Sequence, residues 1–159
     1  MIAVSNSSPL IILYKCNGLG LLKQFFGGVV VPQAVYDEVV HQTKDLEQSA
    51  TISGCDFIKV HELATSVISF SRKLDRGEQE ALALATELHA DFLLLDDKRA
   101  QKEAALLNIP FIPTFALLVK AAQDGLISDF NSMLTELQQK GIFLSRELSL
   151  AAHAFIDRD

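Results

Sequence analysis

The chain alternates short apolar runs with longer segments whose apolar residues recur at helical spacing. The pattern is clearest in GEQEALALATELHADFLLLDDKRA, where Leu82, Ala85 and Leu88 recur with the period of a helix. The wholly apolar residues 92–95 follow, and a strand with no polar face is typical of a parallel sheet covered by helices on both sides. The pattern therefore predicts a helix followed by a buried strand.

The rest of the sequence repeats this alternation, with helix starts such as Ser8-Pro9 and breaks such as Gly27-Gly28 between the apolar runs. Strands alternating with helices predict an α/β fold with a central, mostly parallel sheet. We expect strands at residues 2–5, 29–31, 57–60, 92–95 and 111–112. We expect helices at residues 8–15, 19–26, 32–41, 62–73, 77–88, 98–107, 113–125, 128–140 and 145–157, with a looser helix within residues 42–56.

Length and composition narrow the class of protein. The chain has 159 residues, of which 49% are hydrophobic, and this predicts a single domain over residues 1–159 with a well-filled core. No apolar run is long enough to span a bilayer, and no signal-peptide pattern is present. Cys16 and Cys55 form neither a disulfide framework nor a metal motif. We therefore expect a cytoplasmic protein with no membrane segment.

The charge distribution bears on nucleic-acid binding. A formal net charge of -6 argues against a protein that wraps nucleic acid, because Lys and Arg dominate phosphate binding. It is compatible with a metal-dependent nuclease, whose pocket must be acidic and whose basic contacts can be few. Solvated surface charge is the ordinary interpretation of the two basic clusters around the acidic segment, although both would suit a phosphate backbone. These clusters are Arg72, Lys73 and Arg76, and Lys98, Arg99 and Lys102.

Oxygen-bearing side chains recur at the expected strand ends and helix starts. Carboxylate and amide oxygens are the ligands that Mg²⁺ and Mn²⁺ prefer, and two such ions can hold the attacking and leaving oxygens of a phosphodiester. Ligands bind at the carboxyl ends of strands in open α/β sheets, so convergence at one such edge is expected. The candidates are Asn6, Glu38, Glu78, and Asp96 with its neighbour Asp97.

Each candidate also has a purely structural interpretation. Glu78 and Asp75 fit a capping box, and Asp97 fits the N-cap of the following helix. Glu38 and Glu80 fit solvated helix positions. Asp96 is the hardest to explain in this way, because it follows a buried strand directly and an unpaired charge there is costly.

Other chemistries find little support. Ser7 and Ser8 lack the G-x-S-x-G context of a nucleophile elbow. The sequence has no phosphate-binding glycine motif of the Walker A or dinucleotide type. Its four histidines are isolated, without the spacing of metal ligands.

Five segments resemble PIN-like domains, in the order in which that family carries them. They are SNSSPLIIL, VVVPQAVYDEVV, GEQEALALA, FLLLDDKRA and IPFIPTFALLVKAAQDGLI. The resemblance covers residues 4–148 and is greatest to a prokaryotic group often encoded beside small antitoxin-like partners. It implies a three-layer α/β/α PIN-like fold with a central parallel sheet. It also implies Mg²⁺- or Mn²⁺-dependent cleavage of single-stranded RNA, often by a toxin held by an antitoxin protein, and often a homodimer.

Carried over by position, the four family acids fall on Asn6, Glu38, Glu78 and Asp96, with Asp97 as an adjacent candidate. Glu80 remains an alternative to Glu78. A helix points residues two apart in different directions, so we expect only one of the two to face the pocket. Ser8 matches the small hydroxyl residue that supports the first acid. Asn6 departs from the family, which usually has Asp there. An amide oxygen can bind a metal but brings no charge, so we expect weaker metal binding and loss of the second metal.

The sequence supports two functions, and the effect of Asn6 on metal binding distinguishes between them. The first is a metal-dependent ribonuclease with Glu38, Glu78 and Asp96 as metal ligands and Asn6 as a weaker fourth. The second is a degenerate PIN-like protein that no longer cleaves and binds RNA or a partner protein. A small-molecule phosphatase or other metal hydrolase fits the acids but not the resemblance. We also expect a homodimer through the leucine-rich residues 10–22, which are too apolar for the surface of a small domain.

Overall fold

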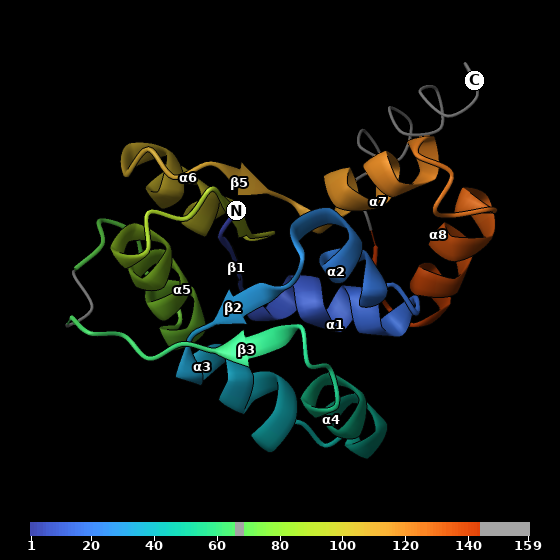
Figure 1. The fold of residues 1–159 in the computed structure, drawn as a ribbon, viewed down its shortest axis with the longest axis horizontal. Helices are drawn as coiled ribbons and strands as arrows, with labels where there is room; N and C mark the ends of the chain where they lie inside the picture. The colour runs from blue at the N-terminus through green and yellow to red at the C-terminus, as the bar shows by residue number, and fades with distance from the viewer. Residues whose placement is uncertain (66–68, 144–159) are drawn as a thin grey trace.

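Five short parallel strands form one sheet in the computed structural model, which describes residues 1–65 and 69–143. Every neighbouring pair is parallel, and the strand order is β3-β2-β1-β4-β5. Figure 1 shows α5 and α6 on one side of this sheet and α1, α2 and α4 on the other. The expected three-layer α/β fold with a parallel sheet is confirmed. The strands are β1 Ala3–Ser5, β2 Val29–Val31, β3 Ile58–Val60, β4 Phe92–Leu94 and β5 Phe111–Ile112.

The strand order reverses between β1 and β4. From β1 the chain moves outward to β2 and β3, and it then returns to place β4 on the other side of β1. The register pairs Val4 with Leu93 and Ser5 with Leu94. Ligand sites in open α/β folds lie in the crevice outside the carboxyl ends of the strands at such a reversal. The residues that follow Ser5 and Leu94 are therefore brought together there.

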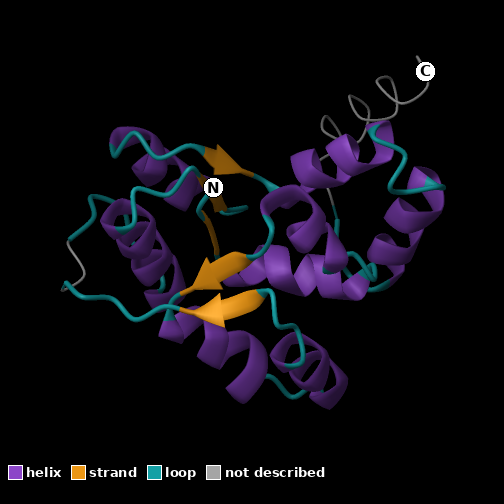
Figure 2. Cartoon of the chain, in the orientation of Figure 1, coloured by secondary structure: helices purple, strands orange, loops and turns teal. Residues whose placement is uncertain are grey.

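The central strands are buried on both faces, as their apolar sequence predicts. Val4, Leu93, Leu94 and Leu95 have no exposed surface. A side chain of this size contributes about 1.5–3 kcal/mol when it is fully buried, so this layer stabilises the sheet edge that precedes the candidate site. Figure 2 shows how few residues are in strands compared with the helices that cover them.

The helices agree with the sequence pattern in most places. One predicted helix over residues 32–41 is found as α3 followed by the π-helical turn η1, and such turns are frequent at functional sites. The helices are α1 Ser7–Lys15, α2 Gly20–Phe26, α3 Gln33–Tyr36, η1 Asp37–His41, α4 Leu46–Ser53, α5 Arg76–Glu87, α6 Lys98–Leu106, α7 Thr114–Gln123 and α8 Phe130–Gln139. The helix expected at residues 145–157 lies outside the described residues.

Two local predictions were wrong. The sequence places Ser8 at the N-cap of the first helix, but that helix begins at Ser7 with Asn6 in the N-cap position. The hydroxyl of Ser8 donates to Asp96 across the sheet edge. The helix expected at residues 62–73 is absent from its described parts, 62–65 and 69–73. There the backbone donates to carboxylates of neighbouring helices, Glu87 for Ala64 and Glu103 for Arg72.

The leucine-rich segment at residues 10–22 packs inside the chain. Leu10, Leu13 and Leu22 have no exposed surface, and Leu19 and Leu21 are also buried. These five leucines form part of the core, so they themselves provide no apolar surface for a second copy. Ile11, Ile12 and Tyr14 of the same segment remain partly exposed, and the homodimer stays a prediction.

Candidate active site

All five residues singled out in the sequence line one pocket of about 400 Å³. Asn6 follows β1, and Asp96 and Asp97 follow β4, so the pocket lies at the strand-order reversal. Glu38 reaches it from the π-helical turn and Glu78 from the first turn of α5. Its lining is completed by Ser7, Ser8, Ile11 and Asp75.

Asn6 is held by its backbone, and its side chain faces no protein partner. The Asn6 N–H donates to the carbonyl of Leu94 at 3.0 Å, which links the ends of β1 and β4. The residue is only 6% exposed, yet within residues 1–65 and 69–143 its amide makes no hydrogen bond. The adjacent Ser7 Oγ is also buried without a partner among the described residues. Among the described residues, Ser7 Oγ is the buried side-chain oxygen without a hydrogen-bond partner, whereas the Asn6 amide, which lines the pocket, has no protein partner and remains open to a ligand or water there.

Asp96 is fixed by three hydrogen bonds. Its Oδ1 accepts from the Thr114 N–H at 2.8 Å, and its Oδ2 accepts from the Thr114 hydroxyl at 2.7 Å and the Ser8 hydroxyl at 3.0 Å. These donors belong to the N-termini of α7 and α1. The charge that follows the buried strand is therefore compensated, and its orientation is set by two helices. Ser8, which we expected to support the first acid, instead donates to the fourth.

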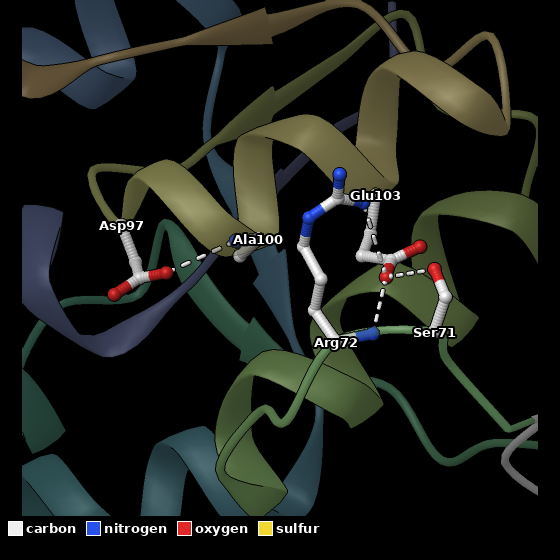
Figure 3. A network of polar contacts seen from close by, with 5 residues as sticks. All are labelled: Ser71, Arg72, Asp97, Ala100 and Glu103. Atoms are coloured by element: carbon white, nitrogen blue, oxygen red, sulfur yellow. Dashed lines mark hydrogen bonds and ion pairs between the residues drawn. The ribbon is translucent and has the colours of Figure 1, made fainter.

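Asp97 both caps a helix and lines the pocket. Its Oδ1 accepts from the Ala100 N–H at 3.0 Å and caps α6, as Figure 3 shows. Asp97 also lines the pocket. A capping carboxylate uses one oxygen for the cap and retains further acceptor capacity on the other.

Glu78, and not Glu80, lines the pocket. Glu78 forms the predicted capping box with Asp75: its Oε1 accepts from the Asp75 N–H at 3.0 Å, and Asp75 Oδ1 accepts from the Glu78 N–H at 2.7 Å. Burial raises the pKa of Glu78, the Asp75 N–H opposes this rise, and the charges of Asp75 and Asp97 raise the pKa further. Glu80 instead accepts from the Ala34 N–H and from Arg76 Nε.

Asp75 is the pocket residue that sequence reasoning treated only as a helix cap. A β-carbon placed on Gly77 would lie 3.5 Å from Asp75 Oδ1 and 3.6 Å from Asn6 Oδ1, so both oxygens border the same small space. The sequence signal was present in the spacing D-x-G-E, but the nearness to Asn6 depends on how α5 packs against β1. Asp75 is exposed, whereas Asn6 and Glu78 are buried.

The family profile described as a PIN domain matches residues 2–155. The chain belongs to the PIN domain family. PIN domains in general include nucleases and depend on divalent metals. The suspected family is thus confirmed over nearly the whole chain.

A solved structure supports the PIN fold. The chain resembles a PilT N-terminus domain protein from the hyperthermophilic archaeon Sulfolobus solfataricus, with a TM-score of 0.57 and 22% sequence identity. The match covers 76% of this chain and 93% of that protein. At this identity the likeness concerns the fold alone. No curated protein sequence matches the chain significantly.

The chemistry of this PIN pocket suits a hard divalent cation. Its lining offers carboxylate and amide oxygens, and the buried Asn6 amide lacks a protein partner in the described chain. Among the described residues, however, no three Asp, Glu, His or Cys side chains are already grouped as a metal cage. Mg²⁺ commonly keeps several waters and uses only one or two carboxylates, so the donor set fits a hydrated ion.

A second carboxylate on α6 holds the segment that leads into α5. Figure 3 shows Glu103 accepting from the Ser71 hydroxyl, the Arg72 N–H and the Arg72 guanidinium. Glu103 is only 4% exposed, and the two shorter bonds are 2.7 Å long. Because α6 also carries Asp97 at its N-terminus, this contact fixes the approach to Asp75 and Glu78 relative to Asp97.

Basic residues beside the pocket divide into paired and unpaired groups. Arg72 pairs with Glu103, and Arg76 pairs with Glu80. Over the residues that the structure describes, no ion pair is formed by the exposed cations Lys73, Lys98, Arg99 and Lys102. No helix in the described ranges is both long and apolar enough to cross a bilayer.

Proposed function

We propose that the protein is a Mg²⁺- or Mn²⁺-dependent endoribonuclease that cleaves single-stranded RNA. Glu38, Glu78 and Asp96 are the proposed metal ligands, Asn6 is a weaker fourth, and Asp97 is an adjacent candidate. The observation that carries the proposal is the gathering of these oxygens in one pocket at the carboxyl ends of β1 and β4. Membership of the PIN family supports the same reaction class.

Each residue has a distinct role in this proposal. Asp96 is held in one orientation by Thr114 and Ser8, so it presents a fixed charge to the pocket. Glu78 is anchored by the capping box, and Glu38 approaches from the π-helical turn. The exposed Lys98 and Arg99 come directly after the pocket residue Asp97 in the sequence, and they would attract the RNA backbone. A divalent cation supplies the positive charge that activates water and stabilises charge on the phosphoryl oxygens.

The test is cleavage of a labelled single-stranded RNA by the purified protein. Cleavage is expected with Mn²⁺ or Mg²⁺ and should stop with EDTA. Glu38→Gln and Asp96→Asn should each abolish it, whereas Glu47→Gln on the exposed side of α4 should not. Duplex RNA and single-stranded DNA serve as competing substrates. Metal-independent cleavage, or full activity in Asp96→Asn, would overturn the assignment.

A biological role as the toxin of a toxin–antitoxin pair is part of the proposal. It rests on the family resemblance, as do the cytoplasmic location, the antitoxin partner and the homodimer. Expression in a bacterial host should arrest growth, and Asp96→Asn should relieve the arrest. Co-purification should recover a small antitoxin protein, and light scattering should give the mass of two chains.

Asn6 favours a second function, a non-cleaving module that binds RNA or a partner protein. Compared with the Asp that the family usually carries at this position, Asn6 gives the pocket one negative charge fewer, because its amide is an uncharged ligand. A protein of this kind would bind single-stranded RNA without cutting it at any metal concentration. Cleavage that appears only in the Asn6→Asp variant would establish this alternative.

A further inference from the structure

Asn6 and Asp75 present oxygen atoms to the same space in the pocket. A β-carbon on Gly77 would lie 3.6 Å from Asn6 Oδ1 and 3.5 Å from Asp75 Oδ1. Gly77 has no side chain, so this space is left open to a small ligand. The two residues come from distant parts of the sequence, one after β1 and the other before α5.

The Asn6 side chain is the clearest sign of a missing partner. It is 6% exposed and, over the described ranges, its amide has no hydrogen bond. The amide lines the pocket and, over the described residues, its oxygen and nitrogen make no bond within the protein, so both are available to a ligand there. Asn6 Oδ1 and Asp75 Oδ1 border the same space, and neither can hydrogen-bond the other because both are acceptors. A cation between them satisfies both.

Asp75 can serve the cap and a ligand together. Its Oδ1 accepts the Glu78 N–H at 2.7 Å, and an ionised carboxylate has a second oxygen with further lone pairs. Asp75 is exposed, so this second oxygen can be reached by a hydrated ion. The charge that the family usually places at position 6 is thus available from α5.

We propose that Asp75 supplies the carboxylate that Asn6 lacks, so that the Asn6 amide and the Asp75 carboxylate together replace the first acid of the pocket. This inference rests on the proposed function, because it concerns the same divalent cation. It assigns to Asp75 a ligand role beyond its place in the capping box. It also explains how the pocket keeps its negative charge with Asn at position 6.

The direct test is Mn²⁺ binding to the metal-free full chain, measured by calorimetry and by the electron paramagnetic resonance of free Mn²⁺. Asp75→Asn removes the charge but retains a good N-cap residue, so α5 should start normally. Its Mn²⁺ dissociation constant should rise roughly tenfold or more, the scale on which groups around a metal act. Asp75→Ser, another N-cap residue, should behave in the same way if Asp75→Asn folds poorly.

Asp129→Asn is the matched control. Asp129 caps α8 through the same type of bond, accepting from the Ser132 N–H at 3.0 Å, and does not line the pocket. This variant should bind Mn²⁺ like the unmodified protein. Asn6→Asp introduced into Asp75→Asn should restore Mn²⁺ binding to about the level of the unmodified protein.

The outcomes separate this inference from the function on which it rests. Unchanged Mn²⁺ binding in Asp75→Asn, with loss in Asp96→Asn, would overturn the role of Asp75 and leave the metal site standing. Weak binding in Asp75→Asn that Asn6→Asp does not restore would overturn the exchange between the two positions. Absence of Mn²⁺ binding in the unmodified protein would overturn both.

Discussion

Thr114 donates both its N–H and its hydroxyl to the carboxylate of Asp96, at 2.8 Å and 2.7 Å. Asp96 follows β4, whereas Thr114 is the first residue of α7. Thr114 is 2% exposed, so little water can replace its hydroxyl. The orientation of the acid thus depends on a residue that no local pattern connects with it.

Thr114→Val should destabilise the protein and misdirect Asp96. The change removes a hydrogen bond to a charged group but keeps the shape of the side chain. A loss of about 1.5–3 kcal/mol in the free energy of unfolding is expected, measured by chemical denaturation. RNA cleavage should fall more than this loss of folded protein accounts for. Thr114→Ser retains the hydroxyl and should remain close to the unmodified protein in activity. If Thr114→Val cleaves RNA as fast as the unmodified protein, Thr114 does not position Asp96.

Asn6→Asp should strengthen metal binding. A unit charge pair about 4 Å apart is worth around 4 kcal/mol at an effective dielectric of 20, before desolvation and repulsion offset much of it. A residual of about 1.4 kcal/mol corresponds to tenfold tighter binding. Calorimetry with Mn²⁺ measures the change, and RNA cleavage should rise with it.

Stability without metal provides a second readout for Asn6→Asp. Repulsion from the neighbouring carboxylates should lower the melting temperature slightly, although a negative charge at the N-terminus of α1 is itself favourable. Asn131→Asp adds the same charge on the exposed surface of α8 and should leave Mn²⁺ affinity unchanged. If Asn6→Asp also leaves that affinity unchanged, Asn6 does not contribute to the site.

Glu103→Gln should reduce the loss of stability on acidification. The Ser71 hydroxyl lowers the pKa of Glu103, helped by the N–H and charge of Arg72 and opposed by desolvation. A carboxyl group whose pKa is lower in the folded state stabilises the protein above its unfolded pKa, near 4.3, and this contribution disappears as the pH falls through the folded pKa. Chemical denaturation from pH 7 down to pH 3 should therefore give a shallower decline for the variant.

The same variant tests how Glu103 supports the pocket. At pH 7 Glu103→Gln should be less stable than the unmodified protein, and it should loosen the segment that leads into α5. Glu136→Gln, at an exposed ion pair on α8, is the comparison for loss of a surface charge. Identical pH profiles for Glu103→Gln and the unmodified protein would show that this network does not contribute to stability.

Lys98→Gln with Arg99→Gln should weaken RNA binding without unfolding the protein. Both cations are exposed at the N-terminus of α6, where the helix dipole does not favour positive charge. For single-stranded RNA, the slope of log affinity against log salt should become shallower by about 0.7 for each phosphate contact removed. Filter binding at several salt concentrations, in EDTA to prevent cleavage, measures this slope.

A matched pair of lysines provides the control for this effect. Lys23 and Lys59 line a separate pocket beside the starts of β1 and β2, away from the acidic residues. Lys23→Gln with Lys59→Gln makes an equal change in net charge and should leave the salt slope unaltered. An equal loss of RNA affinity in both double variants would point to net charge, and not to the α6 N-terminus, as the cause.

The sequence by itself determined most of the architecture, because strands, caps and breaks depend on neighbouring residues. The apolar run before Asp96 predicted a strand buried on both faces, and the spacing of Asp75 and Glu78 predicted the capping box. It also predicted the candidate acids by type and by their place at strand ends. It did not show which of them meet in space.

Only the tertiary structure decided which of these residues lie close together. The reversal of strand order places β4 beside β1, so residues about ninety positions apart, such as Ser8 and Asp96, share a hydrogen bond. The packing of α5 brings Asp75 to Asn6 and turns Glu80 away to Arg76. Folding also buries the leucines that looked like a dimer surface. The physical reason is that a periodic pattern fixes which face of an element is apolar, whereas the partner of that face depends on contacts made across the whole chain.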